Sequence, residues 1–273
     1  MLDVKLLICQ RTNPLYVKYR DRHYISNNGC HGQQLHYLVT INGTLHGVIS
    51  GASAVFGVKS RDDFFCLGRN YDEYRQAVAA SKSGDEFSPS KPCATLKKVQ
   101  LNSIINNVVY RIEGAPHGAA SQILSAWRRR ISSDWEELYG VKVAGFETFV
   151  VEGNLNDREE KCTDRNRTGA LYLADNWEMV GITAGNTKTH SKKAGNGGLG
   201  VSHKRKEVSQ KLVFVKRSTF GKKNRPVPLC TEYKATWQDK EAQKEIQRRR
   251  KELMSRDEGS VAALTGEGQL SLI

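Results

Sequence analysis

The chain contains 273 residues, 38% of them hydrophobic and 26% charged, a composition typical of a globular protein with a sizeable core. No apolar run approaches the roughly 18 residues that a membrane-spanning helix requires, and the N-terminal residues form a short apolar strand pattern without a basic export signal. The six cysteines are scattered and include no C-x-x-C pair, which indicates reduced thiols and neither a zinc site nor a redox motif. We therefore expect a cytoplasmic protein that makes no contact with membranes.

The formal net charge of +13 is concentrated in one segment. Between Asn186 and Arg225, twelve Lys or Arg residues accompany a single acidic residue. A positive field of this density suits a polyanion, because each neutralised phosphate releases condensed counterions. We expect double-stranded DNA as the partner and a basic loop at 186–210 as its contact; the alternative is a solvated loop that only aids solubility. The loop residues expected to touch DNA are Lys188, Lys192, Lys193, Lys204, Arg205 and Lys206.

The first strands are expected near the N-terminus. Lys5–Cys9 is a short apolar run, and Leu35–Ile41 and Leu45–Ser50 are two apolar, β-branched runs joined at Asn42-Gly43. An Asn-Gly pair between such runs is the strongest short-range signal of a β-hairpin.

A long irregular segment follows the hairpin. Between about 60 and 100 the apolar periodicity is lost, and Gly, Ser, Pro and charged residues accumulate, which indicates an insertion with a short helix near Tyr71–Ala80. A strand returns at Ile104–Ile112, where Asn106 and Asn107 stand at places that a central strand normally gives to apolar residues.

A strong helix begins after Gly118 and is expected to end near Gly140, because its large apolar residues recur at i, i+3, i+4, i+7 spacing. Val141–Val151 is then an almost continuous apolar run, typical of a buried central strand. One carboxylate, Glu147, interrupts that run. An unpaired buried carboxylate is costly, so Glu147 must be paired, hydrogen-bonded or neutralised.

The remaining elements are a short helix at Thr168–Asp175, strands at Trp177–Ala184 and Lys211–Lys216, and a charged helix at Asp239–Met254. We expect that last helix to be a solvated appendage. The predicted organisation is a domain at 1–220 and a basic extension at 221–273 that carries the charged helix and a flexible tail.

The order of these elements resembles the second half of the GNAT (N-acetyltransferase-like) fold, an α/β (α+β) architecture with a mixed central sheet flanked by helices. The segment Ala170–Gly181, with the letters ALYLADNWEMVG, resembles the closing signature of that fold. Its Asn-Trp pair, the His-Tyr-Ile-Ser run at 23–26, the glycine-framed strand at 45–51 and the Phe-Glu-Thr-Phe-Val run at 146–150 together resemble the Mom family of phage DNA-modification proteins. A related domain of the Druantia anti-phage system shows similar features.

The resemblance implies a catalytic group made of His23, Tyr24, Glu147 and Tyr172. An imidazole can act as base or metal ligand near neutral pH, and an adjacent phenol can donate or orient. An acidic residue near the end of the fifth strand is suspected in Mom-like proteins, and Glu147 is favoured over Glu152. In acetyltransferases the helix tyrosine, here Tyr172, lies near the cofactor sulfur.

Each of these assignments has a structural alternative. Glu147 could instead bond Asn107 on the neighbouring strand, and Tyr172 could be a core tyrosine. Asn176 and Trp177 either cap and pack the short helix or line a pocket where a flipped base stacks on the indole.

The turn from Gly114 to Gly118, with Ala119 opening the long helix, is expected to hold an anionic cofactor group, because a helix N-terminus combines unpaired N–H donors with the positive end of the dipole. Asn176 is grouped with this cofactor site, and Asn107 and Trp177 with the substrate site. The donor is left open between an acyl-CoA-like molecule and chemistry at a bound iron, and the metal ligands are unknown. The oligomeric state is open, with a dimer among the options.

Two functions from different classes follow. The first is a Mom-like transferase that adds a small group to a base in DNA, by resemblance the exocyclic amine of adenine, and so protects the DNA from restriction. The second is a non-catalytic DNA-binding component of an anti-phage system resembling Druantia. Fold alone does not distinguish them.

Overall fold

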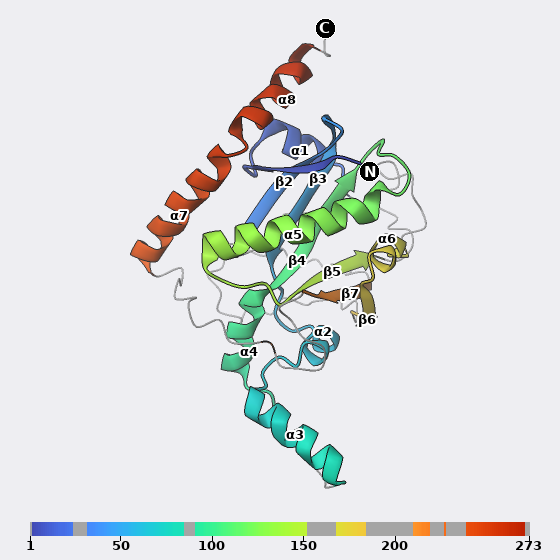
Figure 1. The fold of residues 1–273 in the computed structure, drawn as a ribbon, viewed down its shortest axis with the longest axis vertical. Coiled ribbons are helices and arrows are strands. Elements are labelled where there is room, and N and C mark those ends of the chain that lie inside the picture. Colours follow the sequence, from blue (N-terminus) through green and yellow to red (C-terminus); the bar gives the residue numbers. More distant parts are fainter. Residues whose placement is uncertain are drawn as a thin grey trace, which may run out of the picture.

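The computed structural model describes residues 2–23, 32–84, 91–151, 168–183, 210–218, 227 and 239–270. A seven-stranded mixed sheet, in the order β1-β2-β3-β4-β5-β7-β6, forms its centre (Figure 1). All neighbouring strands are antiparallel except β4 and β5, which are parallel. The strands are β1 (Val4–Cys9), β2 (Gln34–Ile41), β3 (Thr44–Ser53), β4 (Ile104–Ile112), β5 (Gly145–Val151), β6 (Glu178–Ile182) and β7 (Lys211–Arg217).

The predicted hairpin is confirmed. β2 and β3 pair in antiparallel register, and the two residues between them are Asn42 and Gly43. Both have positive φ angles, 51° and 84°. That combination defines the two-residue turn whose twist matches the flanking strands, and Asn and Gly adopt it at the lowest cost.

A single long helix connects the two parallel strands. The helix α5 (Ala119–Tyr139) follows β4 and precedes β5, as a parallel pair requires. Its apolar side, including the fully buried Trp127, Ile131 and Trp135, packs on one face of the sheet. The predicted α/β class with a mixed central sheet flanked by helices is therefore confirmed.

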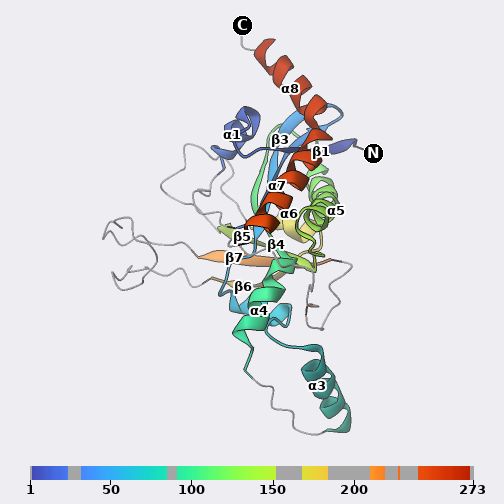
Figure 2. The ribbon, with the colours of Figure 1, turned by 90° about the vertical axis from the view of Figure 1, so that its left-hand side faces the viewer.

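The opposite face of the sheet is covered by two short helices, α1 (Pro14–Arg20) and α2 (Lys59–Phe64). Figure 2 shows α1 and α5 on opposite sides of the strands. The segment between β3 and β4, predicted as an irregular insertion, also contains α3 (Tyr71–Ser83), α4 (Ala94–Gln100) and a turn of 3-10 helix (Leu101–Ser103). The helix α3 extends away from the sheet (Figure 1).

The C-terminal segment differs from the prediction of a solvated helix and a flexible tail. Two helices, α7 (Lys240–Ser255) and α8 (Glu258–Leu270), lie beside β1 and α5. Leu253 of α7 is completely buried in the main core. Between the helices, Asp257 accepts a hydrogen bond of 2.9 Å from the backbone N–H of Ile8 and forms an ion pair of 3.0 Å with Arg130.

This contact explains why the extension is folded. β1 is an edge strand, and an open edge presents unpaired N–H groups that invite aggregation. The carboxylate of Asp257 binds one of these groups and the two helices cover the strand beside it.

In the described part of the chain, no helix combines the length and apolar character needed to cross a membrane.

Candidate active site

The parallel strands β4 and β5 separate in the middle of the sheet. They pair over four residue pairs only, from Ile104 with Gly145 to Asn107 with Thr148. β4 nevertheless continues to Ile112 and β5 to Val151. The backbone of β4 beyond Asn107 therefore has no β5 partner on that side, and the sheet opens at this point.

A β-bulge marks the same position. The register of β3 with β4 shifts so that Ser50 faces Val109 while Gly51 faces Asn107, which leaves Val108 as the extra residue. The side-chain amide of Asn107 donates to the backbone oxygens of Ser50 (3.0 Å) and Val109 (3.2 Å). Asn107 is buried, and its amide fixes the bulge in place.

Tyr172 of the short helix α6 (Ala170–Ala174) reaches the point where the strands separate. Its hydroxyl donates a hydrogen bond of 2.8 Å to Oδ1 of Asn107. The hydroxyl of Thr148 donates to the backbone oxygen of Asn107 (3.0 Å) and lies 3.4 Å from the Tyr172 hydroxyl. One phenol, one amide and one alcohol thus meet between the two strands; we name these three residues the splay cluster.

The helix that carries Tyr172 is held by a second set of contacts. Asp175 accepts two hydrogen bonds from the guanidinium of Arg128 on α5, at 2.8 and 2.9 Å. It also accepts one of 2.8 Å from the indole N–H of Trp177. At the start of the helix, Gly169 has a φ of 76°, and a Cβ there would collide with the ring of Phe214. These contacts hold the helix against the sheet.

Trp177 does not line a pocket as one of the predictions had it. Its indole is 2% exposed and packs edge-on against the Tyr172 ring, with the centroids 5.1 Å apart. A base cannot stack on a face that the core already covers, so the packing alternative applies to Trp177. The side-chain amide of Asn107 is buried and bonded within the sheet.

Asn176, predicted at the cofactor site, is exposed and has a φ of 56°. Asparagine is among the few residues that tolerate this left-handed conformation. The side chain of Lys216 donates to the backbone oxygen of Asn176 at 3.2 Å. The described contacts of Asn176 thus come from its backbone, which ends α6.

The predicted anion-binding turn lies beside the open part of β4. Gly114 and Gly118 have positive φ angles and open space where a side chain would begin. Gly118 caps α5 without a side-chain hydrogen bond. The N–H of Ala119 is bonded to the oxygen of Pro116 and its methyl group is buried in the core, so Ala119 offers no donor. The next N–H groups of the helix, at 120 and 121, lack an intrahelical partner.

Tyr110, which was not among the predicted site residues, lies on β4 next to this turn. Its hydroxyl donates to the backbone oxygen of Ala120 at 3.2 Å. Burial, followed by the nearby Tyr172 and Asp175, raises the pKa of Tyr110 above its ordinary value. Tyr110 therefore stays protonated, and its hydroxyl ties β4 to the first turn of α5.

Glu147 does not join Tyr172 in one cleft, which corrects the prediction. Successive residues of a strand point to opposite faces, and Thr148 is the neighbour that faces Tyr172. Glu147 instead points toward α2, where one carboxylate oxygen bonds the guanidinium of Arg61 and the other accepts from the N–H of Val55 at 3.0 Å.

Both Glu147 and Arg61 have 0% exposed side chains. Burial raises the pKa of Glu147 to about 7, against the opposing effect of the Arg61 charge. The guanidinium of Arg61 also donates to the backbone oxygen of Val55 (2.6 Å) and to Asp62 (2.7 Å). This closed network attaches α2 to β5, so the contacts of Glu147 are those of a structural ion pair.

His23 is buried just after α1, on the face of the sheet away from α5. The preceding Arg22 forms an ion pair of 2.7 Å with Glu113, the residue after β4. His23 thus follows a segment tied to the far end of β4, on the side opposite Tyr172. Tyr24 and Glu152 lie outside the described residues. So do the six loop residues Lys188, Lys192, Lys193, Lys204, Arg205 and Lys206.

The described ranges contain no group of three His, Cys, Asp or Glu side chains arranged to share a metal ion. Thr148, Asp175, Arg128 and Arg61 were not among the site residues predicted from the sequence. Thr148 had one usable signal, because it alternates with Glu147 on β5 and therefore faces the long helix.

No protein-family model matches the chain, and no curated protein matches it. Among solved structures, the chain is similar to an IAA acetyltransferase from Bacillus cereus ATCC 14579, with 10% sequence identity and a TM-score of 0.35. The match covers 79% of this chain and 100% of that one.

Proposed function

We propose that the chain is a GNAT-like transferase that modifies a base in DNA, with its reaction centre at the splay cluster. The observation that carries this proposal is the position of the Tyr172 hydroxyl, 2.8 Å from Asn107, where β4 and β5 separate. A parallel pair that opens beside a bulge presents backbone groups of β4 that have no β5 partner, and a phenol at the apex. This arrangement suits an extended donor lying against β4 with its reactive end near Tyr172.

An acyl-CoA-like donor fits the residues present. The N–H groups at 120 and 121, with the glycine-framed turn before them, suit a diphosphate. Open space at Gly114 and Gly118 leaves room for it. When bound, such a donor supplies an activated carbonyl carbon joined to sulfur.

The chain's own part in the reaction is proton transfer and orientation. The amine nitrogen of the acceptor forms the new bond to the carbonyl carbon as the carbon–sulfur bond breaks. Tyr172 gives its hydroxyl proton to the departing sulfur and regains a proton from the acceptor amine, so that atoms and charges balance. Asn107 and Thr148 hold the phenol at the apex.

The proposed acceptor is the exocyclic amine of adenine. Its support is the net charge of +13 and the resemblance of the segments at 23–26, 146–150 and 170–181 to Mom-like proteins. The target base must leave the helical stack to reach a buried phenol. The transferred group would protect the DNA from restriction nucleases.

One observation favours the alternative, a non-catalytic DNA-binding component. Tyr172 is only 7% exposed and its hydroxyl is already hydrogen-bonded. A tyrosine with these contacts can serve the core alone.

Nucleoside mass spectrometry distinguishes the two functions. DNA is isolated from cells that express the chain, digested to nucleosides and compared with DNA from cells without it. The transferase proposal expects one base, adenine, to carry an added mass. Unaltered nucleosides together with tight DNA binding would support the binding component instead.

A further inference from the structure

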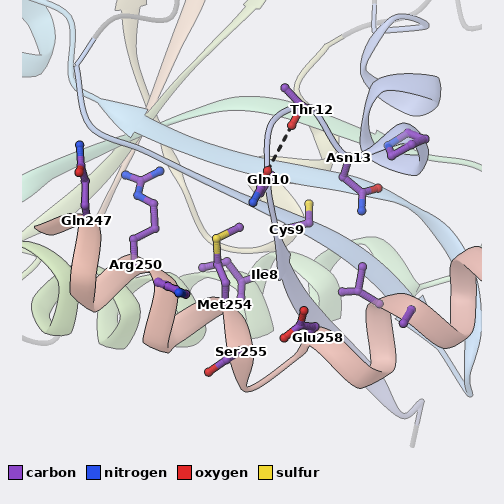
Figure 3. Close-up of a pocket in the computed structure, with 14 residues that line it drawn as sticks. Ile8, Cys9, Gln10, Thr12, Asn13, Gln247, Arg250, Met254, Ser255 and Glu258 are labelled. Atoms are coloured by element: carbon purple, nitrogen blue, oxygen red, sulfur yellow. Dashed lines mark hydrogen bonds between the residues drawn. The ribbon is translucent and has the colours of Figure 1, made fainter.

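A groove lies between the N-terminal segment and the C-terminal helices, at the sheet edge away from the splay cluster. Figure 3 shows it between β1 with the turn that follows and α7 with α8. Its volume is about 720 Å³. Ile8 and Met254 form part of its floor, and Gln10, Thr12, Gln247 and Lys251 line it with polar groups.

The wall formed by α7 continues beyond the groove as a line of exposed polar side chains. Lys240, Lys244, Gln247 and Lys251 follow one another at spacings of four, three and four residues, which puts them on one face of the helix. Three of the four are cations. Within the part of the chain that the structure describes, neither Lys240 nor Lys251 forms an ion pair, and Lys244 is bonded only to the exposed Glu241.

More positive charge gathers where the groove meets the sheet. Arg250, which lines the groove, is accompanied by Arg11 in the turn after β1 and Arg20 at the end of α1. All three lie close enough to the buried His36 to lower its pKa, in addition to the effect of burial. Cations from three separate segments thus lie around one buried histidine, and of these Arg20 is paired with Asp21 and Arg250 donates to the Tyr139 hydroxyl.

The shape of this charge distinguishes between possible ligands. From Lys240 to Lys251 a helix rises by about 17 Å. A small anion would need one concentrated positive point, whereas cations in a line of this length match the repeating phosphates of about five base pairs. Gln, Thr and Ser side chains, which line the groove with the cations, are also common partners of phosphate oxygens.

We propose that Lys240, Lys244 and Lys251, with Arg250, form a second contact surface for the backbone of duplex DNA; we name it the α7 track. The proposal rests on the proposed function, in which DNA is the substrate. β1 and β4 are three strand spacings apart, or about 14 Å. The track lies outside β1, so it would hold the backbone at least about four base pairs from the base at the splay cluster, and it would do so without reading the sequence.

The test compares two triple variants of the full chain. One is Lys240→Gln, Lys244→Gln, Lys251→Gln. The control, Lys59→Gln, Lys98→Gln, Lys142→Gln, removes the same charge from exposed positions elsewhere. The affinity of a fluorescently labelled duplex for each protein is measured by anisotropy over a range of salt concentrations.

Each lost phosphate contact reduces the slope of log affinity against log salt by about 0.9 and lowers the affinity about eightfold at 0.1 M salt. We expect the track variant to lose up to about 2.7 from the slope and the control to lose much less. An unchanged slope, an equal loss in the control, or no binding of duplex by the wild-type chain would each overturn the α7 track.

Binding of heparin and of single-stranded RNA, measured in the same way, tests whether the surface is selective for duplex DNA. If either binds as tightly as the duplex and loses the same slope in the track variant, the surface takes any polyanion and the assignment to duplex DNA fails. Nucleoside mass spectrometry separates this outcome from failure of the proposed function. Suppose that the wild-type chain modifies no base but the track variant still loses salt dependence. The α7 track would then be supported, and the proposed transferase activity would be contradicted.

Discussion

The hydroxyl of Tyr172 donates a hydrogen bond of 2.8 Å to the side-chain oxygen of Asn107, at the last residue pair that β4 and β5 share. The same Asn107 uses its amide nitrogen to fix the bulge in β4. One side chain therefore determines both where the sheet opens and where the phenol lies. The position of the proposed acid is thus coupled to the position of the donor surface.

Asp175→Asn tests the support of that arrangement. The side chains of Asp175 and Arg128 are 8% and 18% exposed, and breaking a largely buried pair leaves a charge without its partner. We expect the free energy of unfolding to fall by about 3 kcal/mol. Urea denaturation measures the loss. Arg128→Lys keeps the charge but loses the bidentate contact. Its free energy of unfolding should therefore lie between those of Asp175→Asn and the wild type.

The same Asp175 variant should also reduce transfer activity by misplacing Tyr172 rather than by removing a reacting group. Its maximal rate is therefore expected to fall while its pH profile keeps the wild-type shape. If Asp175 had only a structural role, Asp175→Asn would lower the stability and leave the rate per folded molecule unaltered.

The buried pair of Glu147 and Arg61 gives a second prediction. Glu147→Gln keeps an acceptor for Val55 but leaves the guanidinium of Arg61 buried without its carboxylate, which should cost about 3 to 5 kcal/mol. The double variant Glu147→Gln, Arg61→Met removes the stranded charge and should recover a large part of the loss. Thermal unfolding of the single and double variants checks this. If Glu147→Gln abolished transfer while the stability stayed at the wild-type value, Glu147 would have to be assigned to the active site.

His36 should make the fold sensitive to acid. Burial, followed by the charges of Arg11, Arg250 and Arg20, lowers its pKa from 6.5 to about 3. Its ring nitrogen Nδ1 lies 3.0 Å from the hydroxyl of Ser50 in the core. Between pH 6.5 and 3 the unfolded chain binds a proton at this residue that the folded chain does not bind. The free energy of unfolding therefore falls as the pH drops through this range.

From pH 6.5 to 5 the contribution of His36 to this fall is about 2 kcal/mol. His36→Gln removes the titrating group and should flatten the pH dependence in that range, although the variant is less stable at neutral pH. Exposed His117, changed to Gln, is the control. A pH dependence identical in the wild type and His36→Gln would show that another group controls acid unfolding.

The sequence predicted the elements whose local signals are strong. The Asn42-Gly43 turn, the long helix between Gly118 and Gly140, and β4 all lie where their patterns indicated. α1, α2 and α4 were missed because helices of six or seven residues contain too few turns for an apolar period to be recognised. α8 was missed because its contacts with α7 and β1 are tertiary contacts. No local sequence pattern indicates them.

The site was predictable only in part. Tyr172 and Asn107 were both singled out, and the structure brings them together. Glu147 was placed with them because an acid in an apolar strand suggests chemistry. Its partner, Arg61, lies 86 residues away in an insertion without periodicity. The ion pair that accounts for the buried carboxylate could therefore not be predicted from the local sequence. Trp177 was misassigned for the same reason, since its partner Asp175 could equally have faced solvent.

The most direct test of the central claim compares wild type with Tyr172→Phe by nucleoside mass spectrometry of DNA from cells expressing each chain. The variant removes one oxygen and keeps the ring that packs on Trp177 and Phe214. A lost hydrogen bond costs about 1 kcal/mol, so the protein should stay folded and bind DNA as before. We expect a modified adenine with the wild type and a loss of about a hundredfold or more with the variant, the range typical of a general acid. Equal modification by both chains would contradict the role of Tyr172, and unmodified DNA with the wild type would contradict the transferase itself.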